Sequence, residues 1–206
     1  TAYHVGVVAK YAFEELLRIP VEVDVASEFR YRDPILNENT LMIIISQSGE
    51  TADTLAALRE AKRAGCRVLS VVNVVGSTIA TESDDVLYTW AGPEISVAST
   101  KAYSTQLAVI YLLALYIGEQ LGKFTQEQLS AYIAALEKLP EQIDEMLKHK
   151  ENIQFFASKY FNASDMYFIG RNVDYAASLE ASLKLKEISY IHSEAYAAGE
   201  LKHGPI

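Results

Sequence analysis

Three hydroxyl side chains, an amide and a glycine lie together in the stretch SQSGET, residues 46–51. An apolar run, LMIII, precedes this stretch, and a run typical of a helix follows it. A helix N-terminus presents unpaired backbone N–H groups and a partial positive charge, and it therefore attracts anions. Ser46, Ser48 and Thr51 can donate hydroxyls at such a place. The stretch predicts either a phosphate-binding loop or an ordinary strand-to-helix turn with Ser48 or Thr51 as the N-cap.

The composition of this loop narrows the class of anion. The loop contains no Lys and matches neither G-x-x-x-x-G-K-[ST] nor G-x-G-x-x-G, so neither a nucleoside triphosphate nor a dinucleotide is expected. Neutral donors, to which Gln47 adds its amide, suit a small phosphate monoester. Glu50 and Asp53 would repel a phosphate, so their carboxylates are expected to point away from it.

Two carboxylates and a lysine fall on one stripe of a predicted helix, because Glu180, Lys184 and Glu187 stand at i, i+4 and i+7. Such a group is either a solvated surface ion pair or acid–base machinery. A buried Glu with a raised pKa can move a proton between two carbons of a sugar. His203, beside Gly204, is either a solvated loop residue or a proton shuttle, because histidine titrates near neutral pH.

The composition argues against several classes of function. The chain has 206 residues and a formal net charge of −9, which disfavours nucleic acid as a partner because phosphate backbones are bound by clustered Lys and Arg. The single cysteine, Cys66, is expected in the core and suits a cytoplasmic protein. No apolar run is long enough to cross a membrane, and no His/Cys cluster has metal-ligand spacing. Neither a membrane, a metal nor a cofactor is therefore expected as a partner.

Strands and helices are expected to alternate, which predicts an α/β fold with a doubly wound parallel sheet. The runs that predict strands are 21–26, 41–46, 67–74, 85–90 and 165–170. The runs that predict helices are 2–18, 52–64, 100–122, 125–148, 150–160 and 173–190. The strand–glycine–helix pattern returns near residue 160, so a second, similar unit is expected to begin there and to be cut off.

Three motifs together resemble one family: SQSGET, then ASTKAY (residues 98–103), then LKLKEISYIHSEAYAAGELKHGP (residues 183–205). They are similar to the sugar isomerase (SIS) region of the glutamine–fructose-6-phosphate aminotransferase family, the glucosamine-6-phosphate synthases. The resemblance implies a three-layer fold of the SIS type. It implies a first SIS domain over 1–122, a helical connection over 123–160 and an incomplete second SIS domain over 161–206.

The resemblance also implies which residues act. Lys184 and Glu187 match the family's proton-transfer pair, and His203 matches the histidine that opens the sugar ring. The positions that match contacts to the sugar phosphate are Thr1, Ala2, Ser46, Gln47, Ser48, Thr51, Val97 and Ser99. Ala2 stands where the family has a serine, so only its backbone could serve.

The resemblance further implies a glutaminase domain that supplies ammonia and a C-terminal Schiff-base lysine in the intact protein, both expected to lie outside this piece. It also implies a homodimer in which His203 reaches the partner's site. The sequence is expected to be a piece truncated at both ends. The apolar positions Leu107, Ile110, Ala114 and Ile117 are expected to offer a dimer face. Two alternatives stay open: a sugar-phosphate-binding regulator without chemistry, and a plain aldose–ketose isomerase without amination.

Overall fold

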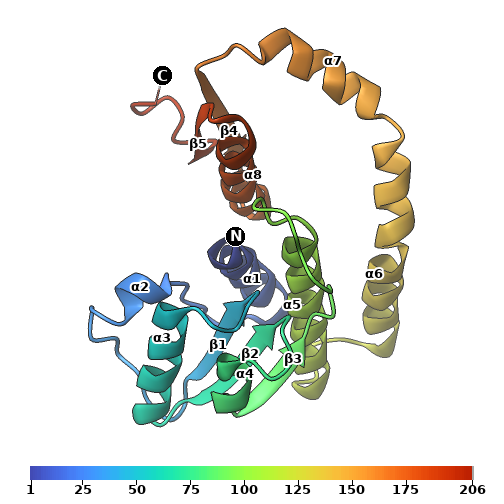
Figure 1. Cartoon of the computed structure of the whole chain (residues 1–206). Helices are drawn as coiled ribbons and strands as arrows, with labels where there is room; N and C mark the ends of the chain where they lie inside the picture. Colours follow the sequence, from blue (N-terminus) through green and yellow to red (C-terminus); the bar gives the residue numbers. More distant parts are fainter. Residues whose placement is uncertain (206) are drawn as a thin grey trace. The chain divides into compact units, whose positions relative to one another are not determined.

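A computed structural model describes residues 1–205 and shows an α/β protein (Figure 1). The chain forms two compact units, Thr1–Leu112 and Leu113–Ile206. The division between these units falls inside helix α5 (Lys101–Gln120). The predicted domain boundaries at residues 122 and 160 remain predictions.

The first unit is built on a parallel sheet of three strands in the order β1 (Leu41–Ser46), β2 (Arg67–Val72), β3 (Asp85–Tyr88). The connections are α3 (Ala52–Arg63) and α4 (Thr78–Glu82). One apolar cluster joins this sheet face to both helices, and its buried members are Ile44, Leu58, Ala61, Cys66, Val68, Val72, Ile79 and Ala80. The core position predicted for Cys66 is confirmed, and the cluster fixes where the loops after β1 and β2 emerge.

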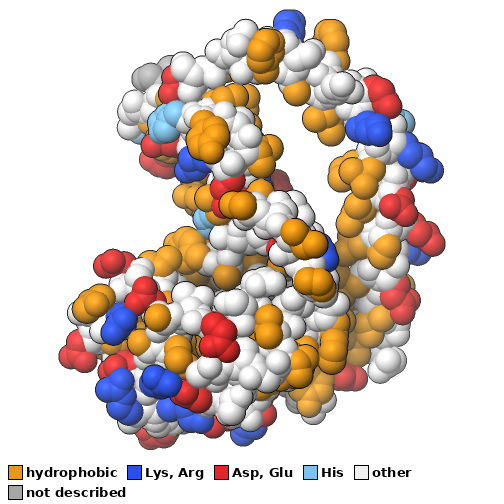
Figure 2. Space-filling model, in the orientation of Figure 1, with side chains coloured by type: hydrophobic (Ala, Val, Ile, Leu, Met, Phe, Trp, Pro, Cys, Tyr) orange, Lys and Arg blue, Asp and Glu red, His pale blue; other side chains and the backbone are white. Residues whose placement is uncertain are grey.

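Charged side chains on α3 form exposed ion pairs with the end of α4 and with the residue just before β3. Figure 2 shows them gathered over α3, at the lower left of the molecule. Arg59 on α3 forms a bidentate ion pair with Glu82 at the end of α4, with N–O distances of 2.6 and 2.8 Å. Lys62 bonds Asp84 at 2.9 Å, just before β3. These exposed pairs each contribute little stability, but they hold α3 beside the element that follows β2.

Helix α1 (Ala2–Leu17) forms where it is predicted, but the run Val21–Ala26 is not a strand. Its backbone N–H groups bond to side chains instead: Val21 N to Glu14 Oε1 at 3.2 Å and Val25 N to Asp24 Oδ1 at 2.8 Å. Among the described residues, β1 pairs only with β2, so this run has no strand ladder to join. A short helix, α2 (Ala26–Phe29), begins at the last residue of this run.

The strands β2 and β3 are each two residues shorter than predicted. Asn73 leaves the ladder after Val72, and its side chain bonds to the segment that follows β3. Trp90 has a left-handed φ of 53°, which a strand does not accommodate. Both departures lie at the carboxyl edge of the sheet, where ligands of open α/β sheets bind.

Most of the apolar face of α5 that was expected to serve a dimer is covered within the chain. Ile110 and Ala114 are fully buried, and Leu107 and Ile117 are half-buried. Ile110 and Ala114 therefore have no surface to offer a partner subunit, and the dimer contact remains a prediction. Within residues 1–205, no helix combines the length and apolarity needed to cross a membrane.

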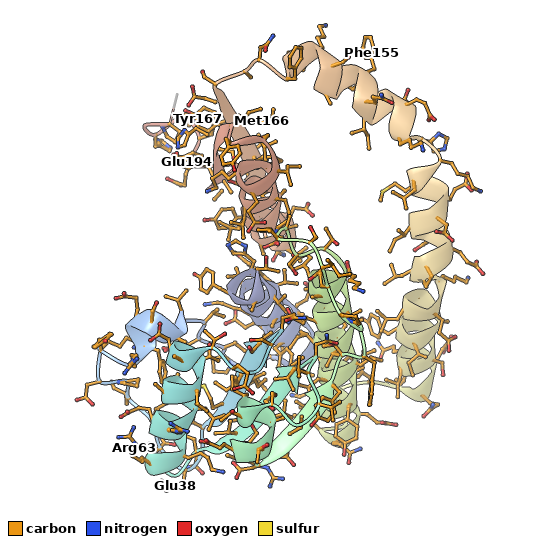
Figure 3. The ribbon with its side chains drawn as sticks, viewed as in Figure 1. Glu38, Arg63, Phe155, Met166, Tyr167 and Glu194 are labelled. Carbon is orange, nitrogen blue, oxygen red and sulfur yellow. The ribbon has the colours of Figure 1, made fainter. Side chains whose placement is uncertain are left out.

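The second unit holds α6 (Gln126–Leu147), α7 (Lys150–Tyr160), β4 (Asp165–Gly170), α8 (Val173–Ser189) and β5 (His192–Ala197). Strands β4 and β5 are parallel, so a second β–α–β unit begins where the sequence predicts it, although β5 itself was not predicted. Helix α8 packs on both strands. On this sheet Tyr167 and Glu194 are register partners and lie side by side in Figure 3.

Candidate functional site

The loop after β1 turns tightly into α3. Ser46 Oγ accepts a hydrogen bond from Gly49 N at 3.0 Å, and Ser48 Oγ accepts one from Glu50 N at 3.2 Å. Both hydroxyls keep their protons for donation. Thr51 is the N-cap of α3, and its side chain makes no capping bond. The N-caps of α1, α2, α4, α7 and α8 also lack a side-chain capping bond, whereas Thr125 caps α6 with a full capping box. The N–H groups in the first turn of α3 are therefore left without a side-chain cap.

Gly49 allows this turn because it has a left-handed φ of 68°. It also leaves room for Ser77: a Cβ atom at position 49 would lie 2.1 Å from Ser77 Oγ. Ser77 is 3% exposed, and its hydroxyl has no hydrogen-bond partner among the described residues. The loop and the start of α4 are thus in close contact, which Ile79 N reinforces by donating to Gly49 O at 3.0 Å.

The two carboxylates beside the loop are engaged elsewhere. Glu50 accepts from Thr78 N and Thr78 Oγ1, both at 2.7 Å. Hydrogen bonds from the Thr78 backbone and then its hydroxyl hold the pKa of Glu50 below its ordinary value. Asp53 bonds to Arg30 Nη1 at 2.7 Å. Both carboxylates have partners outside the loop, as predicted, so they compete less with an anion at the start of α3.

The segment 97–99 lies just before α5. Val97 is 95% exposed, and Ser99 donates its hydroxyl to Glu94 Oε2 at 2.8 Å. Glu94 Oε1 accepts from Thr100 N at 2.7 Å. Burial alone raises the pKa of Glu94, but bonds from the backbone N–H groups of Thr100 and Ala102 and from the Ser99 hydroxyl lower it further than burial raises it. Glu94 thus remains a carboxylate and caps α5.

Thr1 and Ala2, the other two predicted sugar contacts, begin α1. Thr1 is the N-cap, and its carbonyl accepts from Val5 N at 3.1 Å. Both residues are partly exposed. They lie in the first unit, as do the loop at 46–51 and the segment 97–99.

Helix α8 in the second unit brings Lys184 together with two carboxylates. Lys184 Nζ lies 3.4 Å from Glu180 Oε1, and it forms a hydrogen-bonded ion pair with Glu187 Oε2. Glu180 is buried, with 5% of its side chain exposed, whereas Glu187 keeps 28%. A buried carboxylate is costly unless it is paired, so Lys184 offsets part of the cost of burying Glu180. The group is more than a solvated surface pair.

His203 lies in the turn after β5, where its backbone N–H bonds to Glu200 O at 2.9 Å. The side chain of His203 is exposed. Over residues 1–205, no group of three or more His, Cys, Asp or Glu is arranged to hold a metal ion.

Three residues that shape the first-unit loops were not singled out from the sequence: Asn73, Thr78 and Glu94. Asn73 carried a usable signal, because it is a polar residue at the end of an apolar run, but it was assigned to the strand. Thr78 and Glu94 act over separations of 28 and 5–6 residues, which no local capping rule covers.

Comparison with known proteins decides the family. The family described as "SIS domain" matches residues 1–116 and 159–206. The chain belongs to the SIS domain family. Both matched segments lie on the α/β parts of the fold, and the first contains the loop at 46–51.

Individual SIS relatives are similar over the whole chain. A glutamine–fructose-6-phosphate aminotransferase (isomerizing) of Clostridium tetani is 62% identical over 206 residues, which are all of this chain and 34% of that protein. The chain therefore spans about a third of the length of this curated relative.

Solved structures are similar to this chain over almost its whole length. The C-terminal domain of glucosamine-fructose-6-phosphate aminotransferase from Francisella tularensis is 41% identical, with a TM-score of 0.96 over 99% of this chain and 58% of that one. A glucosamine-6-phosphate deaminase from Thermotoga maritima is 28% identical, with a TM-score of 0.80 over 98% of this chain and 60% of its own. The predicted SIS-type fold is thus confirmed.

Proposed function

We propose that this chain is the isomerase part of an amidotransferase that converts fructose 6-phosphate and glutamine-derived ammonia to glucosamine 6-phosphate. The observation that carries the proposal is the loop at 46–51. The first turn of α3 has no side-chain cap, and the loop before it carries the hydroxyls of Ser46, Ser48 and Thr51. The carboxylates of Glu50 and Asp53 have hydrogen-bond partners outside the loop. A phosphate monoester satisfies the N–H groups that such a helix start leaves unpaired.

Each predicted residue has a role in this proposal. Ser46, Ser48 and Thr51, with the Gln47 amide, bind the phosphate group. Thr1, the backbone of Ala2, Val97 and Ser99 bind the sugar. The exposure of Val97 and the fixed orientation of Ser99 are compatible with this role.

The chemistry is assigned to the second unit. Isomerisation of an open-chain ketose removes a proton from C1 and returns one to C2, and Glu187 is the proposed base. Lys184 shares a hydrogen bond with Glu187 and carries the compensating positive charge. His203 is the proposed acid–base group for opening the sugar ring. A positioned general acid or base typically accelerates such a step by about 10² to 10⁴-fold.

Several wider features belong to the same proposal. The full-length protein carries a glutaminase domain, acts in the cytoplasm and forms a homodimer, with His203 reaching the partner's site. It needs neither a metal nor a cofactor. The names of the curated relatives support the amidotransferase activity, and the Lys184–Glu187 pair supports chemistry over a purely binding role.

The test uses the full-length protein with fructose 6-phosphate and glutamine labelled with ¹⁵N in its amide. The expected product, measured by mass spectrometry, is glucosamine 6-phosphate heavier by one mass unit. Glucose 6-phosphate without nitrogen would favour the plain isomerase. Tight binding without any product would favour the regulator.

A further inference from the structure

Asn73 stands one residue beyond the end of β2, between two of the loops discussed above. Its backbone N–H, its side-chain nitrogen and its side-chain oxygen all form hydrogen bonds. Its backbone N–H donates to Gln47 O at 3.2 Å, in the loop at 46–51, which is named the phosphate loop after its proposed role. Its Nδ2 donates to Gly92 O at 2.8 Å. Its Oδ1 accepts from Thr89 Oγ1 at 3.0 Å and from Ala91 N at 2.9 Å. One residue thus bonds to segments that follow β1 and β3.

The side-chain bonds of Asn73 fall on either side of Trp90. Trp90 has a φ of 53°, a conformation that bulky residues rarely adopt, and it is 77% exposed. Such a conformation persists only where the surroundings determine it. One side chain supplies that constraint, because Asn73 accepts from Thr89 and Ala91 and donates to Gly92 O. Asn73 therefore fixes the turn 89–92.

The turn leads directly to the predicted sugar-binding segment. Two residues after Gly92, Glu94 accepts the Ser99 hydroxyl at 2.8 Å and Thr100 N at 2.7 Å. A continuous path of hydrogen bonds and short backbone steps therefore runs from Gln47 through Asn73 and the turn to Ser99. It joins the loop proposed to bind phosphate to the segment proposed to bind the sugar.

We propose that Asn73 is a positioning residue that sets the sugar-binding segment 97–99 relative to the phosphate loop. This proposal rests on the proposed function, since it assigns a role within the same site. The backbone N–H of Asn73 holds the phosphate loop, and its side chain holds the turn. Removing only the side chain should therefore leave phosphate binding intact and weaken recognition of the sugar.

The test compares Asn73→Ala with the unaltered chain and with Asn39→Ala, the same change at an exposed position before β1. Each chain is titrated with inorganic phosphate and with fructose 6-phosphate by calorimetry. For Asn73→Ala, we expect the fructose 6-phosphate affinity to fall about tenfold, equivalent to about 1.4 kcal/mol. The inorganic phosphate affinity should stay within about twofold of the unaltered chain, on the same scale.

Trp90 provides an independent signature because it is the only tryptophan in the sequence. Its fluorescence anisotropy should fall in Asn73→Ala, since its turn loses three hydrogen bonds, and should be unchanged in Asn39→Ala. If Asn73→Ala does not fold, Asn73→Asp serves in its place. It keeps an acceptor for Thr89 and Ala91, loses the donor to Gly92 O, and should show the same selective loss.

The outcomes separate the two proposals. Equal losses for both ligands, or no loss for fructose 6-phosphate, would overturn the role of Asn73 and leave the proposed function standing. If the unaltered chain binds neither ligand, the proposed function fails and the role of Asn73 falls with it.

Discussion

Replacing Glu187 by Gln in the full-length protein is expected to lower the rate of fructose 6-phosphate isomerisation by roughly 10² to 10⁴-fold. The amide keeps the shape of the side chain and can still bond to Lys184, but it cannot take up a proton. The measurement is the isomerisation rate at saturating substrate. The binding of fructose 6-phosphate should change little, because the phosphate contacts are assigned to residues 46–51 and the amide keeps the shape of the Glu187 side chain.

Glu137→Gln is the matched control for this experiment, since Glu137 is an exposed residue of α6 to which no role is assigned. It should leave the isomerisation rate unchanged. A Glu187→Gln variant that retains more than half of the activity would show that another group is the base. Glu180, the buried carboxylate beside Lys184, would then be the next residue to replace.

Replacing Gly49 by Ala is expected to destabilise the first unit and to abolish phosphate binding. A non-glycine residue in the left-handed region costs about 1–2 kcal/mol. The new Cβ would also lie 2.1 Å from Ser77 Oγ and 2.6 Å from Ser77 Cβ. Overpacking of this kind costs about 1–3 kcal/mol more. The free energy of unfolding from a denaturant titration should therefore fall by about 2–5 kcal/mol, the sum of those two costs.

Two further variants separate the causes. Gly76 has a φ of 74°, and a Cβ there would meet nothing within 4 Å, so Gly76→Ala should show only the conformational cost. Adding Ser77→Gly to Gly49→Ala removes the clash. The double variant should therefore regain the part of the free energy of unfolding that overpacking had cost. If Gly49→Ala is no more destabilising than Gly76→Ala, the close contact between the phosphate loop and α4 is unimportant.

Sequence reasoning succeeds in this protein where one local pattern determines the element. The run LMIIIS is a strand, although only Ile44 and Ser46 in it are buried. The periodic runs of α3, α6 and α8 are helices within one or two residues of prediction. It fails for Val21–Ala26, whose alternation is typical of a strand. A strand also needs a neighbour in the sheet, and a single run does not reveal whether one is present.

The same distinction applies to the site. The hydroxyls of the phosphate loop and the Lys184–Glu187 pair are local in sequence and could be predicted. The partners that complete the loop could not, because Glu50 meets Thr78 and Gln47 meets Asn73 only after the strands assemble. The burial of Glu180, compared with the exposure of Glu187, likewise depends on how α8 packs on its sheet.

The most direct test of the account is a titration of the ¹⁵N-labelled 206-residue chain with fructose 6-phosphate, followed by amide NMR. The account predicts the largest shifts at residues 46–54, where the loop meets the uncapped start of α3, and saturation of those shifts with ligand. Inorganic phosphate should shift the same amides. A folded chain in which the amides of residues 46–54 do not respond to either ligand would contradict the account.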